Sequence, residues 1–176
     1  MKRILIAFIV LAAMLLSACG GAAPAPTDEP AVGVPNPIHE TDEKGLAEAT
    51  GISLPAPEGA EDVSWSYIEL KGEPPIAQMN FTLGGQKAYL RAQATDKTEA
   101  SQLPDISGLY YEWNTTAEDQ VAYCKAYVNT NGEAGYIAWL DVVPGVQYCL
   151  GMTEGASVLE LVKLANHVFV PLQGDA

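Results

Sequence analysis

Three cysteines and two histidines are the residues of this 176-residue chain best suited to covalent or metal chemistry. They are Cys19, Cys124, Cys149, His39 and His167. A metal site needs three or four ligands that converge on one point. His39 lies beside acidic residues in an expected loop, and His167 lies near the end of an expected helix, where the helix dipole favours it. Because nothing in the sequence brings the two together, we predict no metal and no other cofactor.

The segment before Cys19 indicates secretion and lipid attachment. The chain starts with the positive Met1-Lys2-Arg3 and continues with an uncharged apolar run from Ile4 to Ala18. That run is shorter than the roughly 20 residues needed to cross a bilayer, which favours a cleaved signal peptide over a retained anchor. Its end, Leu16-Ser17-Ala18-Cys19, resembles the lipobox of bacterial lipoproteins, which implies cleavage before Cys19 and diacylglycerol on its sulfur. The alternative is a chance cysteine after an ordinary secretion signal.

Two acyl chains attach a protein stably to a membrane, whereas one short chain does so only marginally. We therefore expect the mature protein to be lipid-anchored at the cell membrane, on its extracytoplasmic face. Residues 20–35 are rich in Pro, Ala and Gly and show no apolar period, which is typical of an extended spacer. The predicted organisation is a signal peptide over 1–18, a linker over 19–35 and a single domain over 36–173.

The charge of the chain excludes one class of partner. It has 22 Asp and Glu against 9 Lys and Arg, a net charge of −13. Loss of the signal peptide removes Lys2 and Arg3, so 7 basic and 22 acidic residues remain and the net charge becomes −15. Because such a surface repels phosphates, we predict no binding to nucleic acid.

The pattern of the domain predicts the α+β class. Short helices are expected over 41–51, with Thr41 as N-cap, and over 157–168, where Ser157 and Glu160 have capping-box spacing. Between them we expect an antiparallel sheet of about seven strands, with the C-terminal helix packed on it. The strand candidates are 63–70, 76–83, 86–94, 108–113, 119–128, 134–142 and 146–152.

Turn signals predict the pairing of these strands. A two-residue turn at Gly84-Gly85 pairs Leu83 with Gln86 and gives that hairpin one apolar and one polar face. In the second half, turns at Asn131-Gly132 and Pro144-Gly145 pair Cys124 with Trp139 and Cys149 with Leu140. Trp139 is then a core residue.

The same pairing bears on a disulfide between Cys124 and Cys149. It places the two sulfurs on opposite faces and two strands apart, about 9.5 Å by strand spacing. That separation exceeds the roughly 7 Å Cα limit for a disulfide. We therefore favour two buried thiols, while a disulfide, if formed, would mean that the predicted strand order is wrong.

Aromatic residues are the one enrichment that suggests binding. Trp65, Tyr110, Tyr111 and Trp113 lie on two expected strands, where aromatics either pack within the sheet or form a contact surface for a ligand or partner. Packing is the favoured interpretation, and these four residues are the candidate binding residues if the second holds. Between the strands, Asp105 to Gly108 is expected to form a local turn, with Asp105 and Ser107 bonding nearby backbone.

Several short motifs resemble an uncharacterised bacterial lipoprotein family that carries domain of unknown function 4367. They are Asn36-Pro37-Ile38, Ile76-Ala77-Gln78, Tyr89-Leu90-Arg91, Asp105-Ile106-Ser107-Gly108, Ala138-Trp139 and Val146-Gln147-Tyr148. The resemblance covers residues 36–170 and implies an extracytoplasmic domain, but it transfers no catalytic residue. Cys124 and Cys149 depart from the family pattern.

No nucleophile, base or metal constellation is visible, so we predict no catalytic residues and favour a binding or sensory module that contacts a protein or small ligand outside the cytoplasm. One alternative is an envelope-polymer hydrolase that uses a pair of Asp or Glu side chains. Another is an envelope-stress accessory that binds lipid or misfolded chains, which would require a sizeable apolar cavity between the sheet and the helix.

Overall fold

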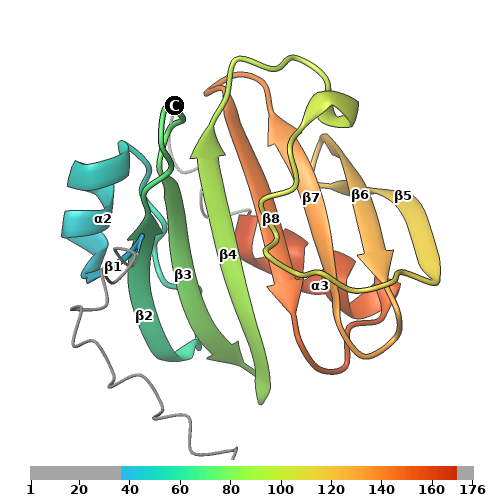
Figure 1. The fold of residues 1–176 in the computed structure, drawn as a ribbon. Coiled ribbons are helices and arrows are strands. Elements are labelled where there is room, and N and C mark those ends of the chain that lie inside the picture. Colours follow the sequence, from blue (N-terminus) through green and yellow to red (C-terminus); the bar gives the residue numbers. More distant parts are fainter. Residues whose placement is uncertain (1–36, 170–176) are drawn as a thin grey trace, which may run out of the picture. The chain divides into compact units, whose positions relative to one another are not determined.

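One antiparallel sheet dominates the computed structural model, which describes residues 37–169 (Figure 1). Its eight strands are β1 (Ile38–Thr41), β2 (Glu61–Ile68), β3 (Ile76–Leu83), β4 (Gln86–Ala94), β5 (Thr115–Val121), β6 (Cys124–Thr130), β7 (Gly135–Asp141) and β8 (Val146–Met152). Two α-helices, α2 (Glu43–Thr50) and α3 (Val158–Phe169), and the 3-10 turn η1 (Ala100–Gln102) complete the described fold. The predicted signal peptide, Cys19 and the linker lie outside these residues.

The strand order β1-β2-β3-β4-β8-β7-β6-β5 divides the sheet into two four-stranded meanders. Each meander follows the chain, and the two join where β4 pairs with β8, Leu90 opposite Leu150. The predicted sheet with a C-terminal helix is therefore confirmed, with eight strands in place of about seven.

The β3–β4 hairpin has the predicted register. Leu83 pairs with Gln86 and Phe81 with Ala88, so Met79, Phe81 and Leu90 point to one side. Gly84 and Gly85 both have positive φ, at 58° and 81°, which a two-residue hairpin turn requires.

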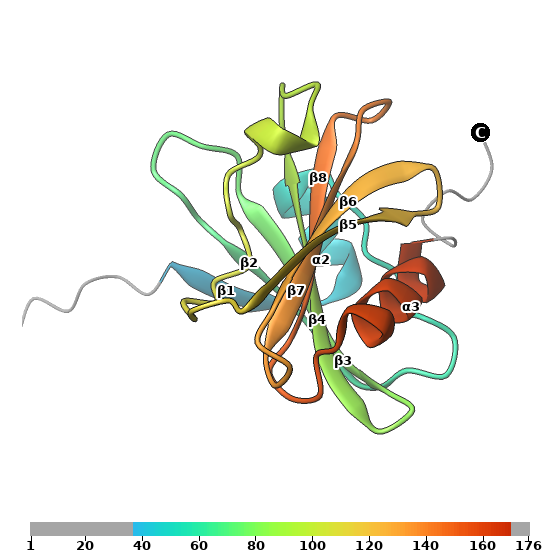
Figure 2. The same ribbon diagram turned by 90° about the vertical axis from the view of Figure 1, so that its right-hand side faces the viewer.

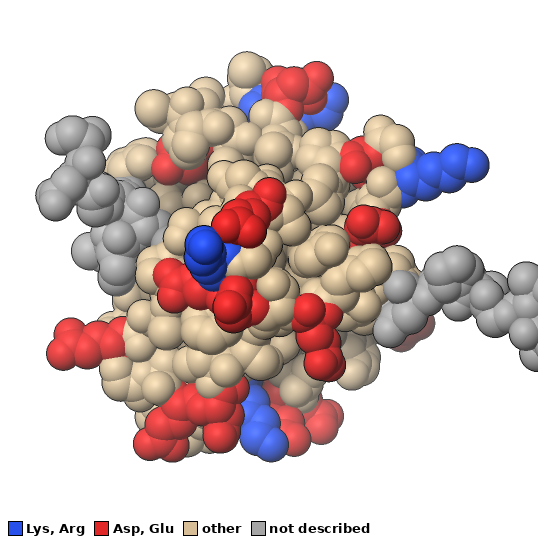
Figure 3. Space-filling view, turned by 90° about the vertical axis from the view of Figure 1, so that its left-hand side faces the viewer, with Lys and Arg blue, Asp and Glu red and all other residues tan. Residues whose placement is uncertain are grey.

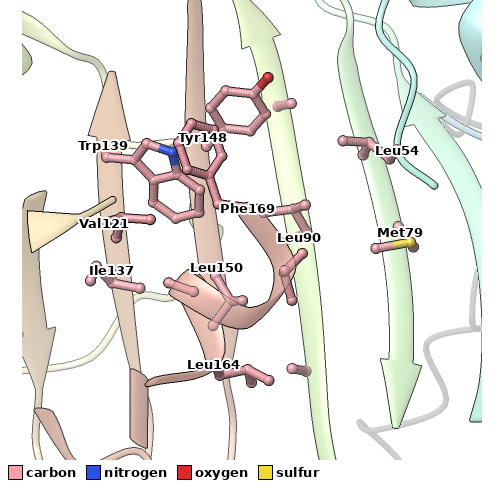
Figure 4. Packing of buried hydrophobic residues seen from close by; sticks show 14 of the residues in the cluster. Leu54, Met79, Leu90, Val121, Ile137, Trp139, Tyr148, Leu150, Leu164 and Phe169 are labelled. Carbon is pink, nitrogen blue, oxygen red and sulfur yellow. The ribbon is translucent and has the colours of Figure 1, made fainter. Parts of the chain in front are cut away.

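Both helices cover the same side of the sheet, which we call the helix face (Figure 2). Trp139, Leu150 and Leu161 are fully buried there. Phe169 meets the rings of Trp139 and Tyr148 edge-on at centroid distances of 5.4 and 5.5 Å (Figure 4). Trp139 is thus a core residue, as predicted. Large side chains fill the space between α3 and the strands, so this core is built by packing.

Local capping explains where the helices begin. The side chain of Asp42 accepts a hydrogen bond from the Gly45 amide at 2.7 Å, so Asp42 is the N-cap of α2. The predicted N-cap, Thr41, is wrong by one residue because Thr41 pairs with Trp65 at the end of β1. In α3 the Ser157 hydroxyl accepts from the Glu160 amide at 3.2 Å, as its capping-box spacing predicted.

None of the helices within residues 37–169 is both long and apolar enough to cross a membrane.

Three strand predictions need correction. Residues 108–113 form no strand, and the predicted strand over 119–128 is divided by a turn at Ala122-Tyr123 into β5 and β6. The short β1 was not predicted, because its four residues fall where the sequence indicated a loop. His39 therefore lies in a strand and stacks on Tyr67 at a ring distance of 4.8 Å, rather than in a solvated loop.

The pairing predicted for the second half is shifted by two residues. Trp139 pairs with Ala126 instead of Cys124, and Cys149 pairs with Ala138 instead of Leu140. Both connecting loops contain four residues where two were expected, since Thr130 pairs with Gly135 and Asp141 with Val146. A shift of two keeps every side chain on its predicted face, because side chains alternate with a period of two.

Acidic side chains are spread over the face seen in Figure 3, with few basic side chains among them. The ion pairs that the basic residues form are exposed, such as Lys44 with Glu48 at 3.5 Å and Lys125 with Glu118 at 3.0 Å. Exposed pairs of this kind contribute little to stability, so the negative field of the domain remains largely uncompensated.

Candidate functional site

A long connection between β4 and β5, residues 95–114, crosses the side of the sheet opposite the helices (Figures 1 and 2). We call this connection the strap and the side it crosses the outer face. Ile106 is buried and packs with Cys149 and Ile76 in a small hydrophobic cluster that is separate from the main core. The strap is therefore seated on the sheet by an apolar contact of its own.

Hydrogen bonds from β4 fasten the middle of the strap. The Tyr89 hydroxyl donates to the Ser107 carbonyl at 2.7 Å, and Arg91 Nη1 donates to the Ile106 carbonyl at 2.8 Å. Arg91 Nε also donates to Gln78 at 2.7 Å, which fixes the guanidinium between sheet and strap. The pKa of Tyr89 is raised, mainly by burial. Its hydroxyl therefore keeps its proton and remains a donor at physiological pH.

The strap turns sharply where it touches the sheet. Asp105 accepts from the Ser107 amide at 2.7 Å, and the Ser107 hydroxyl accepts from the Leu109 amide at 3.1 Å. Gly108 has φ of 69°, and a Cβ there would lie 2.4 Å from Arg91 Nη1. The predicted local turn is confirmed, and glycine is required both by the backbone angle and by the approach of Arg91.

A second glycine makes room beneath the strap. A Cβ on Gly151 would lie 2.1 Å from the ring of Tyr89, the residue opposite it on β4. The Tyr89 ring thus lies against Gly151 on β8, and its hydroxyl reaches the Ser107 carbonyl. Gly151 is the position where the sheet admits the side chain that holds the strap.

Between the strap and β5 to β8 lies a pocket of about 360 Å³, which we call the strap pocket. The small side chains of Ala138 and Cys149, paired across β7 and β8, are part of its lining. Further lining residues come from the neighbouring strands and from the strap: Thr116, Tyr127, Asn129, Tyr136, Leu103, Pro104 and Asp105. A pocket of this volume is within the range that takes small ligands.

A polar network runs along one wall of the strap pocket. The Thr116 hydroxyl donates to Asn129 Oδ1 at 2.8 Å, and Asn129 Nδ2 donates to the Tyr136 hydroxyl at 2.9 Å. Burial and then the nearby charge of Asp105 raise the pKa of Tyr136, while the hydrogen bond from Asn129 lowers it. The wall is thus uncharged apart from Asp105.

A larger pocket, of about 580 Å³, adjoins the first and is called here the apical groove. The two share Ala100, Ser101 and Tyr127 in their linings, so they meet beside η1. The rim of the apical groove is apolar and exposed, with Tyr123 at 62%, Val142 at 54% and Val143 at 92% exposure. Exposed apolar residues gathered at one groove are characteristic of contact sites.

The candidate binding residues do not form one site. Trp65 packs against the main core on the helix face and donates to the Leu54 carbonyl at 2.9 Å. Tyr110 and Tyr111 lie on the strap, 96% and 49% exposed, and Trp113 packs edge-on against Tyr136 at 5.6 Å. The prediction that these aromatic residues pack within the fold is thus confirmed for Trp65 and Trp113. Tyr110 and Tyr111 instead expose their aromatic surface.

The two cysteines lie on opposite faces of the sheet, in separate clusters, and both are free thiols. Burial, and then the charge of Asp141, raise the pKa of Cys124 to about 11. Burial also raises the pKa of Cys149, the thiol in the strap pocket. Both are therefore protonated and poorly nucleophilic near neutral pH.

The sequence interpretation missed the residues that build the strap pocket, Tyr127, Asn129, Tyr136 and Ala138. They alternate with core residues on β6 and β7, which indicates only that they face outward. A usable signal was the 20-residue interval from 95 to 114, whose Pro104 and Gly108 argue for a structured connection rather than a strand. Such long loops are frequently functional.

Within residues 37–169 no group of three His, Cys, Asp or Glu residues is placed to hold a metal ion.

A further pocket of about 580 Å³ lies between α3 and the β3–β4 turn, but Glu160, Lys163 and His167 share its lining with Leu83 and Leu164. This is not the apolar cavity that lipid or misfolded chains would need.

Comparisons with protein-family models, curated proteins and solved structures give no match to the chain.

Proposed function

We propose that this protein is a lipoprotein attached to the cell membrane through Cys19, whose domain binds a ligand or partner segment outside the cytoplasm. The proposed binding site is the strap pocket together with the apical groove. The observation that carries the proposal is their junction beside η1, where the exposed apolar rim of the apical groove continues into a pocket with an ordered polar wall.

The construction of the outer face supports binding. Tyr123, Val142 and Val143 gather exposed apolar surface at the apical groove. The Tyr123 hydroxyl donates to Asp141 at 3.1 Å, so its ring is held in place at the rim. Rigid aromatic side chains bind partners at a low cost in conformational entropy.

The attachment to the membrane rests on the sequence around Cys19. The resemblance to the lipoprotein family with domain of unknown function 4367 agrees with it and remains part of the proposal. Cys19→Ala should release the protein from the membrane fraction of lysed cells, because no acyl chain can then be added. Cys124→Ala, a buried cysteine on β6, is the matched control and should leave the protein membrane-bound. Full retention of Cys19→Ala would contradict the anchor.

The binding site is tested separately in intact cells. A photo-crosslinking residue at Tyr123 should form a defined adduct, because this position is on the rim of the apical groove. The control position is Leu159, which is 72% exposed on α3 and thus on the other side of the sheet. Equal labelling at the two positions would show that the groove has no special role.

A further inference from the structure

Two buried glutamine side chains join β4 to β8 beside the strap pocket. Gln93 and Gln147 lie opposite each other on the two strands and are 3% and 2% exposed. Gln147 Nε2 donates to Gln93 Oε1 at 2.6 Å, and Gln93 Nε2 donates to the Pro74 carbonyl at 2.7 Å. The two side-chain amides therefore form a short chain of hydrogen bonds that ends on a backbone oxygen.

That backbone oxygen fixes the direction in which each amide faces. A carbonyl oxygen accepts but cannot donate, so Gln93 must turn its nitrogen toward Pro74 and its oxygen toward Gln147. Gln147 must then turn its nitrogen toward Gln93, which leaves Gln147 Oε1 on the other side of the amide. A reversed Gln147 amide would place two oxygens against each other and lose a buried hydrogen bond, so the observed orientation is the stable one.

The remaining oxygen of Gln147 is turned toward the strap pocket. Gln93 lines a neighbouring pocket of about 560 Å³ beside β4 and does not line the strap pocket, whereas Gln147 lines both. The nitrogen of Gln147 therefore faces the neighbouring pocket, and its oxygen faces the strap pocket. Oε1 accepts no hydrogen bond from any residue within 37–169. It is also not among the fully buried polar atoms without a partner in that region, so it keeps access to the pocket.

An acceptor that is almost completely buried favours a ligand that brings a donor to it, because an unmade hydrogen bond at such an atom is costly. Gln147 Nε2 makes one hydrogen bond and has a second hydrogen, so the same side chain can also donate. A carboxamide carries an N–H donor beside a carbonyl acceptor and matches both properties of Gln147. Ala138 and Cys149, in the same pocket lining, provide apolar surface for the rest of such a ligand.

We propose that Gln147 determines the specificity of the strap pocket by binding an amide group of the ligand, with Gln147 Oε1 accepting from the ligand N–H. The proposal rests on the proposed function and specifies the group that the same site recognises. Gln93 is a positioning residue, because it holds the Gln147 amide in the orientation that presents its oxygen. The ligand amide belongs either to a free carboxamide or to a peptide group of a partner segment.

The test uses the full lipidated chain in a neutral detergent, with isotope-labelled glutamine side chains, titrated by NMR with butyramide and with methyl propyl ketone. The two compounds have nearly the same shape, but the ketone has a methyl group in place of the amide nitrogen and cannot donate. Butyramide should shift the side-chain signal of Gln147. No shift of that signal up to about 100 mM butyramide would overturn the proposal.

The contribution of Gln147 is measured as the ratio of the two affinities, butyramide over methyl propyl ketone. The ratio cancels the different hydration of the two compounds when variants are compared. Gln147→Met removes the acceptor and keeps a side chain of similar size, so the ratio should fall about three- to tenfold. Gln120→Met makes the same change at an exposed position on β5 and should leave the ratio as in the native protein. An unchanged ratio in Gln147→Met would also overturn the proposal.

Gln93→Met tests the positioning role and keeps the test decisive if Gln147→Met does not fold. Without the oxygen of Gln93, the Gln147 amide can reverse and present its nitrogen to the pocket, so the ratio should fall here too, by a smaller factor. A native ratio in Gln93→Met would refute the positioning role of Gln93.

The source of the amide is separated with N-acetyl-alanine N-methylamide, whose N–H groups belong to a peptide backbone. Tighter binding of this compound than of butyramide supports a partner segment, and its exclusion supports a free carboxamide. If neither amide reaches Gln147 while the crosslink at Tyr123 and the membrane attachment persist, the role of Gln147 is wrong and the proposed function stands. Loss of the crosslink or of the attachment would instead refute the proposed function.

Discussion

The two faces of the sheet are built by different means from alternate residues of the same strands. On the helix face, Trp139, Leu150 and Met79 are fully buried and fill the space beneath the helices. On the outer face, the strap is held by hydrogen bonds from Tyr89 and Arg91, and Ile106 is its buried apolar side chain. The first face supplies stability through packing, and the second leaves a pocket. The difference shows how one sheet can carry a packed core on one face and a pocket on the other without separate domains.

Removing a packed side chain from the helix face should have the largest effect on stability. Leu150→Ala should lower the free energy of unfolding by about 2–5 kcal/mol, because its side chain is fully buried in the main cluster. Urea unfolding followed by Trp fluorescence measures this. Leu159→Ala, at an exposed position on α3, should change stability by less than about 0.5 kcal/mol. Similar losses for both variants would mean that packing does not dominate this face.

A smaller effect is expected where the strap is seated. Gly151→Ala places a methyl group on the ring of Tyr89 and should cost roughly 1–3 kcal/mol, since the ring and the strap must shift. Limited proteolysis should then cut within 95–114 faster than in the native protein. Gly155→Ala is the control for a methyl group added where there is room, because a Cβ there meets nothing within 4 Å. Its φ of 67° adds backbone strain but no clash with the strap. Faster strap cleavage in that control would contradict the assignment.

Removing one hydrogen bond of the strap should have a milder consequence. Tyr89→Phe keeps the ring over Gly151 but loses the bond to the Ser107 carbonyl, at a cost of about 1 kcal/mol. Amide exchange at Ser107 and Leu109 should accelerate, while exchange in β7 and β8 stays as in the native protein. Acceleration spread evenly over the sheet would show that strap and core open together.

The smallest effect is the response of the buried thiol of Cys124 to alkaline pH. Its folded-state pKa of about 11 lies above the ordinary value of 9.0, so the unfolded chain loses its proton first as pH rises. Stability should therefore fall from about pH 9 upward and lose a few tenths of a kcal/mol by about pH 9.5. Cys124→Ala should flatten this part of the pH profile in urea unfolding. If the slope of stability against pH is unchanged in Cys124→Ala, the pH dependence arises from the buried tyrosines instead.

How much the sequence predicts depends on how local the determining contacts are. The Gly84-Gly85 hairpin was predicted with its register because its turn and its alternation lie within one stretch of chain. The loops after β6 and β7 are two residues longer than predicted. Trp139 still lies on its predicted face of the sheet, because a shift of two residues leaves every side chain on the same face. Residues 108–113 resemble a strand by their aromatics, but Gly108 turns around Arg91, a contact that no local pattern contains.

The candidate site was less predictable for the same reason. Asp105 and Ser107 were correctly assigned to a local turn, because their partners are two residues away. The strap pocket combines Asp105 with Asn129 and Tyr136, which meet only when the strap is folded over the second meander. Periodicity indicates that Asn129 and Tyr136 face away from the core, but not that anything covers them.

The junction of β4 with β8 also determines the order in which the molecule is completed. The ribosome makes the chain from its N-terminus, so the first meander is finished at Ala94, whereas the partner of its last strand begins only at Val146. Until that partner arrives, β4 presents a full row of unpaired backbone groups, which is a template for aggregation. The interval between the synthesis of these two strands is therefore the period in which the chain most needs protection from aggregation.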